Sequence, residues 1–369
     1  MKRKPSALFI ALTLFGTLGI TRQASAQKAQ SQFITFDAPG AGVGSGQGTV
    51  PRSINPSGEI TGEYYDSTEA THGFVRAADG IIATFEVPGA SMGNAQGTYP
   101  RSINPEGDVA GFYYDASHVV VSTRGFVRAA DGNIITFDAG PNLGTIPLSI
   151  NPSGETTGAY SSHGFVRAAD GYITTFDVGS IVTVPTSINP SGEITGMYAD
   201  SSFISHGFLR DRDGTITKFD VVVPSLGTLP QSINPEGEIT GLYMDTRGPH
   251  GFVRDKDGEI TTFDVPGATL GTVTTSINPR GEITGNYFDA SSLARGLVRD
   301  KDGEITTFAV PGAGGPFFGD GTIPQSINPS GEITGLYTDA IGAYHGFLRE
   351  PHGGGSEDQL NNERGEHSE

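Results

Sequence analysis

Ser53-Ile54-Asn55-Pro56 opens the stretch SINPSGEITG (residues 53–62), and its recurrence along the chain decides the fold. The Ser-Ile-Asn-Pro tetrapeptide occurs seven times, at intervals of 38 to 50 residues. A repeat of about 45 residues is typical of propeller blades built from four strands each. The seven asparagines are Asn55, Asn104, Asn151, Asn189, Asn234, Asn278 and Asn328.

Each repeat is predicted to contain four short strands, A to D. In the first complete copy these are residues 50–55, 59–64, 73–76 and 81–87. Asn55-Pro56-Ser57-Gly58 is typical of a turn, because Asn accepts hydrogen bonds, Pro presets φ and Gly ends the turn. Asp79-Gly80 between two apolar runs predicts the C–D hairpin. The pattern indicates an all-β chain of four-stranded antiparallel blades.

Loop lengths divide the expected blades into two faces. The A–B and C–D turns have the same length in all seven copies. The B–C stretch, counted from Tyr64 to Gly73 and equivalents, varies from 4 to 12 residues, and the D–A stretch, from Asp37 to Ser53 and equivalents, from 10 to 17. B–C and D–A loops share one face of an up-and-down blade. Binding usually occurs on variable loops of a rigid scaffold, so this variable-loop face is the expected binding face.

The two ends of the repeat region are complementary. The last repeat has no strand D, whereas a lone strand at residues 33–37 precedes the first complete repeat. Pairing this strand with the blade containing residues 322–350 would remove two open sheet edges. We therefore predict a closed seven-bladed β-propeller over residues 27–353.

Both termini differ in composition from the repeats. Lys2, Arg3 and Lys4 precede an apolar run at residues 7–20 and a small-residue cleavage site at 24–26, which predicts a signal peptide at residues 1–26. An uncleaved membrane anchor is the alternative, although the run is short for spanning a bilayer. We expect export to the periplasm or the extracellular space. Residues 354–369 are polar and are predicted to be disordered.

Charge limits the classes of partner. Removing residues 1–26 takes away four basic residues and no acidic one, so the mature chain carries a formal charge of −22. Nucleic acids and anionic lipids require clustered Lys and Arg, so neither is an expected partner. We expect no membrane insertion after signal removal, and a monomer. The chain contains no cysteine and hence no disulfide.

The repeat resembles that of the HAF-repeat family of exported bacterial proteins. In that family a Ser-x-Ala-x-x-Ile-Asn-x-x-Gly-x-x-x-Gly stretch leads to His-Ala-Phe, and here residues 53–62 lead to His72-Gly73-Phe74. The chain departs from the pattern in this Gly, and in an Arg where the family often has Trp. The resemblance implies a repeat fold and export, and carries no activity.

A histidine and an aspartate flank most B–C loops. The pairs are His72 with Asp66, His206 with Asp200, His250 with Asp245 and His345 with Asp339. We interpret them as structural contacts that pin the loop ends, since chemistry at one site would require one repeat to differ from the others. His163 has Ser162 in place of the Asp, and Arg124 and Arg295 replace the His in two repeats.

Acidic residues recur at two further positions. Asp-x-Asp-Gly at residues 211–214, 255–258 and 300–303 resembles the start of a calcium loop but lacks its later glutamate, so we interpret it as a hairpin turn. Weak Ca²⁺ binding is the alternative, and no other metal or cofactor is expected. The acidic residue that starts each strand B is either solvated or part of a cation funnel.

Aromatic residues in the variable loops are the candidate binding residues: Tyr65, Tyr99, Tyr114, Phe288, Phe317, Phe318 and Tyr344. We expect a non-catalytic scaffold that binds an extracellular protein or polysaccharide on the variable-loop face. The alternative is a carbohydrate-active or lyase-type enzyme with a site at the ring mouth. An enzyme should show one blade with unique polar residues around a cavity, and the third repeat, with its short B–C loop, is the outlier.

Overall fold

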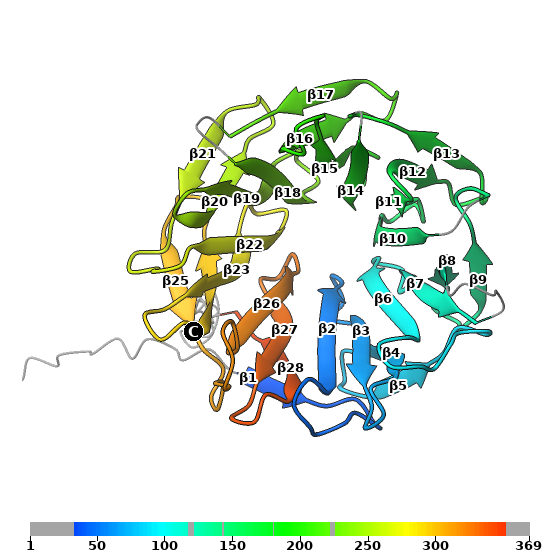
Figure 1. Ribbon diagram of the computed structural model, residues 1–369, viewed down its shortest axis with the longest axis vertical. Helices are drawn as coiled ribbons and strands as arrows, with labels where there is room; N and C mark the ends of the chain where they lie inside the picture. Colours follow the sequence, from blue (N-terminus) through cyan, green and yellow to red (C-terminus); the bar gives the residue numbers. More distant parts are fainter. Residues whose placement is uncertain (1–32, 117–121, 142–143, 180, 222–225, 352–369) are drawn as a thin grey trace, which may run out of the picture. The chain divides into compact units, whose positions relative to one another are not determined.

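Strands are the only regular secondary structure in the computed structural model, which describes residues 33–116, 122–141, 144–179, 181–221 and 226–351. This part of the chain contains 28 strands in antiparallel groups of four. Figure 1 shows the groups arranged around a central axis, with strand A of each group innermost. The expected signal peptide and polar tail lie outside the described residues.

The strands follow the predicted A to D order. The A strands are β2 (Gly48–Ile54), β6 (Thr98–Ile103), β10 (Thr145–Ile150), β14 (Val182–Ile188), β18 (Gly227–Ile233), β22 (Thr272–Ile277) and β26 (Thr322–Ile327). The B strands are β3 (Ile60–Tyr65), β7 (Val109–Asp115), β11 (Thr156–Tyr160), β15 (Ile194–Ala199), β19 (Ile239–Asp245), β23 (Ile283–Phe288) and β27 (Ile333–Thr338). The C strands are β4 (Thr71–Arg76), β8 (Ser122–Arg128), β12 (His163–Arg167), β16 (Ser205–Arg210), β20 (Gly248–Arg254), β24 (Ala294–Arg299) and β28 (Tyr344–Arg349). The D strands are β5 (Ile82–Phe85), β9 (Ile134–Phe137), β13 (Ile173–Phe176), β17 (Ile216–Phe219), β21 (Ile260–Phe263), β25 (Ile305–Phe308) and β1 (Phe33–Phe36).

The A–B turn explains the constant length of the repeated motif. Gly58 N–H donates to the Asn55 carbonyl at 3.0 Å, and Asn55 N–H donates to the Glu59 carbonyl at 2.9 Å. Gly58 has a φ of 85°, which favours glycine. A short hairpin loop that ends in such a glycine sets the strand register.

The apolar core lies between neighbouring groups of strands. Phe85 of β5 packs edge-on against Phe126 of β8, with ring centroids 6.1 Å apart. The Arg128 guanidinium lies 5.0 Å from the Phe85 ring centroid, so the ring face contacts the cation where burial limits its hydration. An Arg at the end of strand C makes the same contact in all seven groups.

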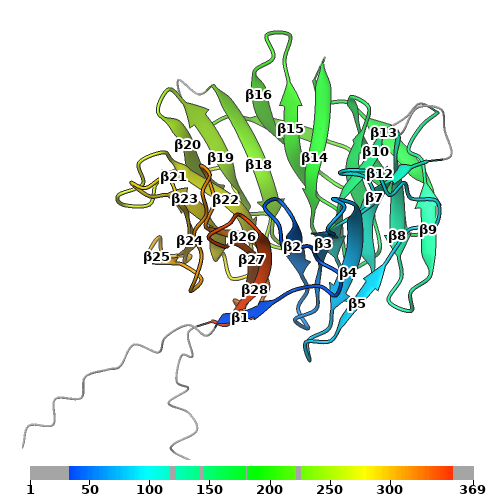
Figure 2. The ribbon, with the colours of Figure 1, turned by 60° about the horizontal axis from the view of Figure 1, so that its bottom comes forward.

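The first strand completes the last group. β1 pairs antiparallel with β28, from Phe33 opposite Arg349 to Phe36 opposite Gly346. Figure 2 shows these two strands side by side. Phe36 also contacts the next group, since the Arg76 guanidinium lies 5.0 Å from its ring centroid. Strand β1 therefore joins the two ends of the described chain.

A circle of side-chain hydrogen bonds surrounds the axis. Each motif asparagine donates from Nδ2 to the carbonyl of the next motif asparagine, at 3.1 to 3.4 Å, and Asn328 donates to Asn55. We call these seven residues the asparagine circle. In the same turns Asn55 Nδ2 donates to Glu59 Oε2 at 2.7 Å, and Asn55 Oδ1 accepts from Glu59 N–H at 2.9 Å. The acidic residue at the start of strand B thus stabilises the circle.

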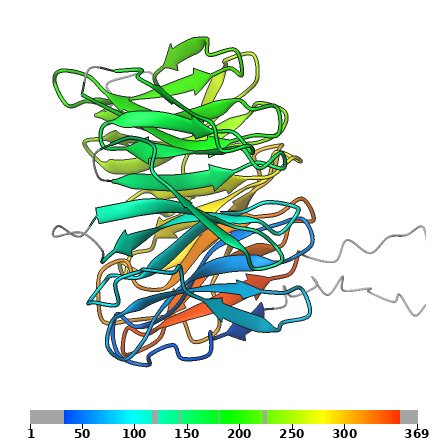
Figure 3. The same cartoon turned by 90° about the vertical axis from the view of Figure 1, so that its right-hand side faces the viewer.

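The B–C and D–A loops lie on the same side of the strand groups, opposite the short turns (Figure 3). Within the described ranges, no helix has the length and apolar character needed to cross a membrane.

Candidate functional site

A β-bulge in each A strand directs one residue toward the central axis. The register with strand B shifts between Pro51 and Ser53, which leaves Arg52 as the extra residue, and the other six A strands shift at the equivalent position. Bulges commonly re-aim a side chain in this way. The seven extra residues are Arg52, Arg101, Leu148, Thr186, Gln231, Thr275 and Gln325.

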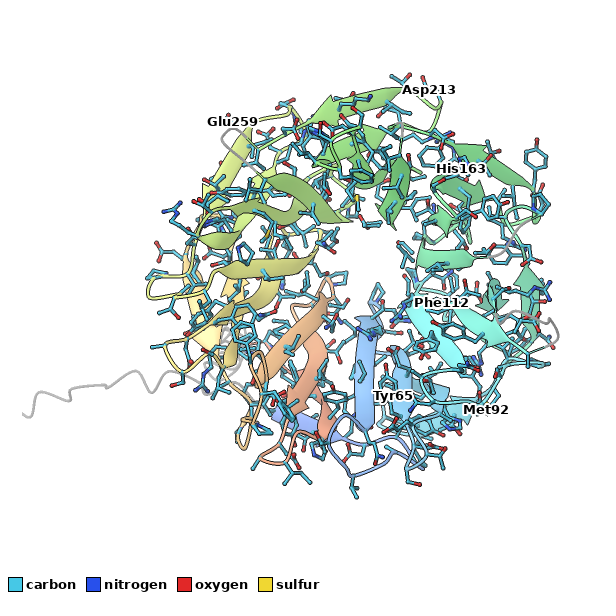
Figure 4. All side chains as sticks on the ribbon, in the orientation of Figure 1. Tyr65, Met92, Phe112, His163, Asp213 and Glu259 are labelled. Atoms are coloured by element: carbon cyan, nitrogen blue, oxygen red, sulfur yellow. The ribbon has the colours of Figure 1, made fainter. Side chains whose placement is uncertain are left out.

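Six of these bulge residues, all except Thr275, line a cavity of about 550 Å³, which we call the channel cavity. Its lining combines two cations, an apolar wall and neutral polar side chains. Figure 4 shows Phe112 at the inner edge of the ring, with Met92 farther out. The lining residues are Arg52, Arg101, Phe112, Ile146, Leu148, Thr186, Gln231 and Gln325.

Glu63 of β3 lies behind the two arginines and is fully buried. Its Oε1 accepts hydrogen bonds from Arg52 Nε at 2.9 Å and from Arg52 Nη2, and lies 3.4 Å from Arg101 Nη1. Its Oε2 is buried without a hydrogen-bond partner among the described residues. We call Arg52, Glu63 and Arg101 the arginine–glutamate cluster.

The cluster carries one net positive charge, because two guanidinium groups share one carboxylate. Burial lowers the pKa of Arg52, but Glu63 more than compensates and raises it above the usual value. Burial lowers the pKa of Arg101, and Arg52 adds to that effect while Glu63 opposes it. Both side chains stay protonated, since arginine has an unperturbed pKa above 12. Glu63 therefore neutralises the positive charge of Arg101 less than it neutralises that of Arg52.

Aromatic rings support Arg101. Tyr99 and Phe112 are stacked at 4.9 Å, and the Arg101 guanidinium lies 5.5 Å and 5.1 Å from their centroids. Tyr114 packs edge-on against Tyr99 at 5.7 Å. The Tyr99 hydroxyl donates to the Ala95 carbonyl at 2.8 Å. These contacts restrict the movement of Arg101 beside the cavity.

Six of the seven predicted aromatic residues lie in contacting pairs. Tyr65 contacts Tyr344 at 6.4 Å, and Phe288 stacks on Phe318 at 5.3 Å. Their placement in loops was wrong for five of them, because the strands extend farther toward the variable-loop face than the motif indicates. The five strand residues are Tyr65, Tyr99, Tyr114, Phe288 and Tyr344, while Phe317 and Phe318 lie in the β25–β26 loop.

The four predicted histidine–aspartate pairs lie within contact distance at the B–C loops. The His Nε2 to Asp Oδ distances are 3.2 Å for His72–Asp66, 3.4 Å for His206–Asp200, 2.9 Å for His250–Asp245 and 3.5 Å for His345–Asp339. Each aspartate also accepts a backbone N–H of its own loop, as Asp66 does from Thr68 and Ala70. These geometries are those of a structural clamp at the base of each loop.

Each of these histidines also contacts an acidic residue after strand D, which the sequence analysis did not include. His250 Nδ1 lies 2.9 Å from Asp264, and His345 Nδ1 lies 3.0 Å from Asp37, which follows the first strand. Burial lowers the pKa of His250, but Asp245 and Asp264 together raise it above the usual value. Burial raises the pKa of Asp66, whereas hydrogen bonds from Thr68 and His72 bring it down to about 2. The recurring Thr-Phe-Asp at the end of strand D was the available signal.

The arginine–glutamate cluster was also missed. Its members come from the first two repeats and not from the third repeat, whose B–C loop is short, as predicted. Aligning the repeats would have marked it, because the residue after the strand B glycine is Glu63 once and otherwise Phe112, Ala159, Met197, Leu242, Asn286 and Leu336.

The Asp-x-Asp-Gly stretches form hairpin turns. Asp255 Oδ1 accepts the N–H groups of Asp257 and Glu259, and Asp300 Oδ1 accepts those of Asp302 and Glu304. In the part of the chain that is described, no three His, Asp or Glu side chains gather as a metal site would require.

Comparison with known proteins gives the fold. No family model and no curated protein matches the chain. A streptogramin B lyase structure is similar with a TM-score of 0.56 and 14% identity, covering 88% of this chain and 99% of that one. Virginiamycin B lyase from Staphylococcus aureus has a TM-score of 0.55 and 13% identity, covering 87% and 100%. The β-propeller domain of the trilobed protease from Pyrococcus furiosus has a TM-score of 0.57 and 10% identity, covering 82% and 93%. At these identities the likeness shows the fold alone. This chain has a β-propeller fold.

Proposed function

We propose that the chain is an exported, closed seven-bladed propeller that acts as a non-catalytic binding scaffold through its variable-loop face. The count of 28 strands, the pairing of β1 with β28 and the hydrogen bond from Asn328 to Asn55 support closure. The predicted signal peptide and the resemblance to HAF-repeat proteins support export.

One observation carries the binding proposal. Of the 13 exposed large hydrophobic side chains in the described ranges, ten lie in B–C or D–A loops. Apolar groups gathered on one face of a soluble protein mark an interaction surface. We call these ten residues the apolar rim: Val43, Met92, Ile181, Phe203, Ile204, Leu226, Leu270, Phe317, Phe318 and Ile341.

The rim favours a protein partner over a polysaccharide. Six of its ten residues are aliphatic, counting Val, Ile and Leu, and Met92 adds a flexible thioether. Such side chains fill the apolar centre of protein interfaces, where Met and aromatic residues are enriched and most charged residues are depleted. Pyranose rings are bound mainly by stacking on aromatic faces, which only Phe203, Phe317 and Phe318 offer on the rim.

The channel cavity favours binding over catalysis. Its two arginines are unique to this cavity but come from two blades, and none of the described residues that line it is His, Cys, Asp or Glu. A general acid or base requires a group that titrates near the working pH and reaches the substrate. Glu63 is fully buried behind Arg52. The lyase-type alternative is therefore not favoured.

A pair of triple variants tests the proposal. Val43→Ser, Phe203→Ser and Phe318→Ser together remove rim contacts, while Ile81→Ser, Ile135→Ser and Tyr172→Ser remove three exposed hydrophobics outside these loops. We expect partners crosslinked from the envelope and culture fluid of the source organism to be lost with the first variant and kept with the second. Equal capture by both variants, or binding only on a glycan array, would contradict a protein-binding rim.

A further inference from the structure

We propose that the channel cavity binds a single carboxylate, carried by a short peptide segment of the protein partner, and that Arg101 is its main contact. This inference rests on the proposed function, because the rim would bring that segment to the cavity. The expected ligand group is the carboxylate of an Asp or Glu side chain or of a chain terminus, with an apolar residue beside it.

The charge balance of the cluster carries the argument. Arg52 makes two hydrogen bonds to Glu63, whereas Arg101 makes one at 3.4 Å. No other hydrogen bond of Arg101 is found among the described residues, although a guanidinium has five N–H donors in a planar fork. Arginine binds carboxylates through two parallel hydrogen bonds of this geometry. Arg101 thus retains the donors and the charge for one carboxylate.

Position makes this charge effective. The Arg101 side chain is 20% exposed and the Arg52 side chain 27%, and both line the cavity. Water screens a partly buried charge less than an exposed one. Stacking on Tyr99 and Phe112 also holds the Arg101 fork in place before a ligand arrives. A preorganised group loses less freedom on binding.

The lining favours a peptide over a polyanion. Ile146, Leu148 and Phe112 give the cavity an apolar side, which matches an apolar residue beside the acid. The mature chain is expected to carry a formal charge of −22. The negative electrostatic field of the protein repels a polymer with a carboxylate on every unit, such as polygalacturonate. A segment with a single carboxylate among apolar residues is repelled less, and its carboxylate is attracted by the local positive charge of the cluster.

A selection from random 12-residue peptides displayed on phage, against the mature protein, tests the inference. We expect selected peptides to share one Asp or Glu beside an apolar residue. Arg101→Gln should weaken their binding by about tenfold to a hundredfold, since charge-assisted pairs are strong. Arg101→Lys should retain part of the affinity. Arg212→Gln is the matched control, because Arg212 has the same charge and lies in the β16–β17 turn, outside the cavity and the variable-loop face.

The outcomes separate this inference from the proposed function. Three results together would support a direct contact: binding is lost with Arg101→Gln, it is kept with Arg212→Gln, and changing the peptide acid to its amide causes no further loss in the Arg101→Gln variant. Peptides that depend on Phe318 and not on Arg101 would overturn the carboxylate site and leave the rim proposal intact. If no peptide is selected and oligogalacturonate binds in an Arg101-dependent manner, the proposal that a peptide occupies the cavity is overturned. Unchanged circular dichroism and melting temperature for Arg101→Gln show that its effect is not unfolding.

Discussion

The asparagine circle and the arginine–glutamate cluster both lie along the central axis, but only the circle repeats in every blade. Each asparagine is buried and makes the same hydrogen bonds to its own turn and to the next blade. The cluster occurs once, and one oxygen of its buried carboxylate has no hydrogen-bond partner among the described residues. A polar group that recurs in every blade is explained by a structural role, since its hydrogen bonds hold the turns and neighbouring blades together. A polar group that appears once, with a cost in desolvation, is not explained in this way, and we propose that it serves binding.

The largest expected effect comes from deleting residues 33–37. This removes β1 and exposes the edge of β28, together with the contacts of Phe33 to Phe347 and of Phe36 to Phe74. Loss of two packed phenylalanines alone should reduce the free energy of unfolding by about 5 kcal/mol or more. Thermal melting measures it, with deletion of residues 356–369 as the control. Equal melting temperatures for both deletions would contradict closure through β1.

The next effect separates the cluster from architecture. Glu63→Leu leaves Arg52 and Arg101 without their carboxylate and should reduce the free energy of unfolding by about 2–3 kcal/mol, below the range for fully buried pairs because both arginines reach water. Urea unfolding measures it. The triple variant Arg52→Gln, Glu63→Leu, Arg101→Gln introduces residues found in other repeats and should regain wild-type stability. A triple variant that stays as unstable as Glu63→Leu would indicate that the cluster is structural.

A smaller effect is expected within the circle. Asn189→Ala removes the hydrogen bond to the Asn234 carbonyl and leaves the Glu193 N–H without its acceptor. Buried groups left unpaired in this way cost about 1–3 kcal/mol. Asn234→Ala should cost the same, since its contacts are equivalent. Ser191→Ala, at an exposed position of the same turn, is the control for urea unfolding. Unequal costs at the two asparagines would show that the circle is not uniform.

The smallest effect depends on pH. The folded-state pKa of His250 is raised, so its contribution to stability is complete below the unfolded value of about 6.5 and is lost as pH rises through the folded value. His250→Gln should therefore lower the melting temperature most near pH 6, by the equivalent of about 1 kcal/mol, and least near pH 9. Asp245, whose pKa is lowered, stays charged over this range.

Arg124 supplies the matched comparison for that histidine. It occupies the same position in the second blade and contacts Asp115 and Asp138, but it does not titrate between pH 6 and 9. Arg124→Gln should lower the melting temperature by a similar amount at every pH in this window. A pH-independent loss for His250→Gln as well would show that its contacts do not depend on charge.

Much of the local structure could be predicted from the sequence. The turn at Asn55 to Gly58 and the order of four strands follow from residue types and spacing within a dozen positions. The bounds were less accurate: Tyr65 and Tyr114 were placed in loops but lie at strand ends. Where a strand ends depends on pairing with its neighbour, which the local pattern does not contain.

The cluster shows the opposite case. Arg52 and Arg101 belong to different repeats, and each alone resembles an ordinary exposed arginine. Only the packing of β2 and β3 against β6 brings both to one carboxylate. The sequence contained the signal as an unusual residue at position 63, but it could not show what that residue contacts.

By itself the amino-acid sequence determined the repeat, the turns, the four-strand order and the division into constant and variable loops. These depend on backbone preferences and hydrogen bonds between residues close in the chain. Only the tertiary structure decided which distant side chains meet. The asparagine circle and the two arginines at the cavity join different blades, and the acids that clamp the histidines come from strands of the same blade. Such distances are set by how the blades pack around the axis, which no segment of the chain specifies alone.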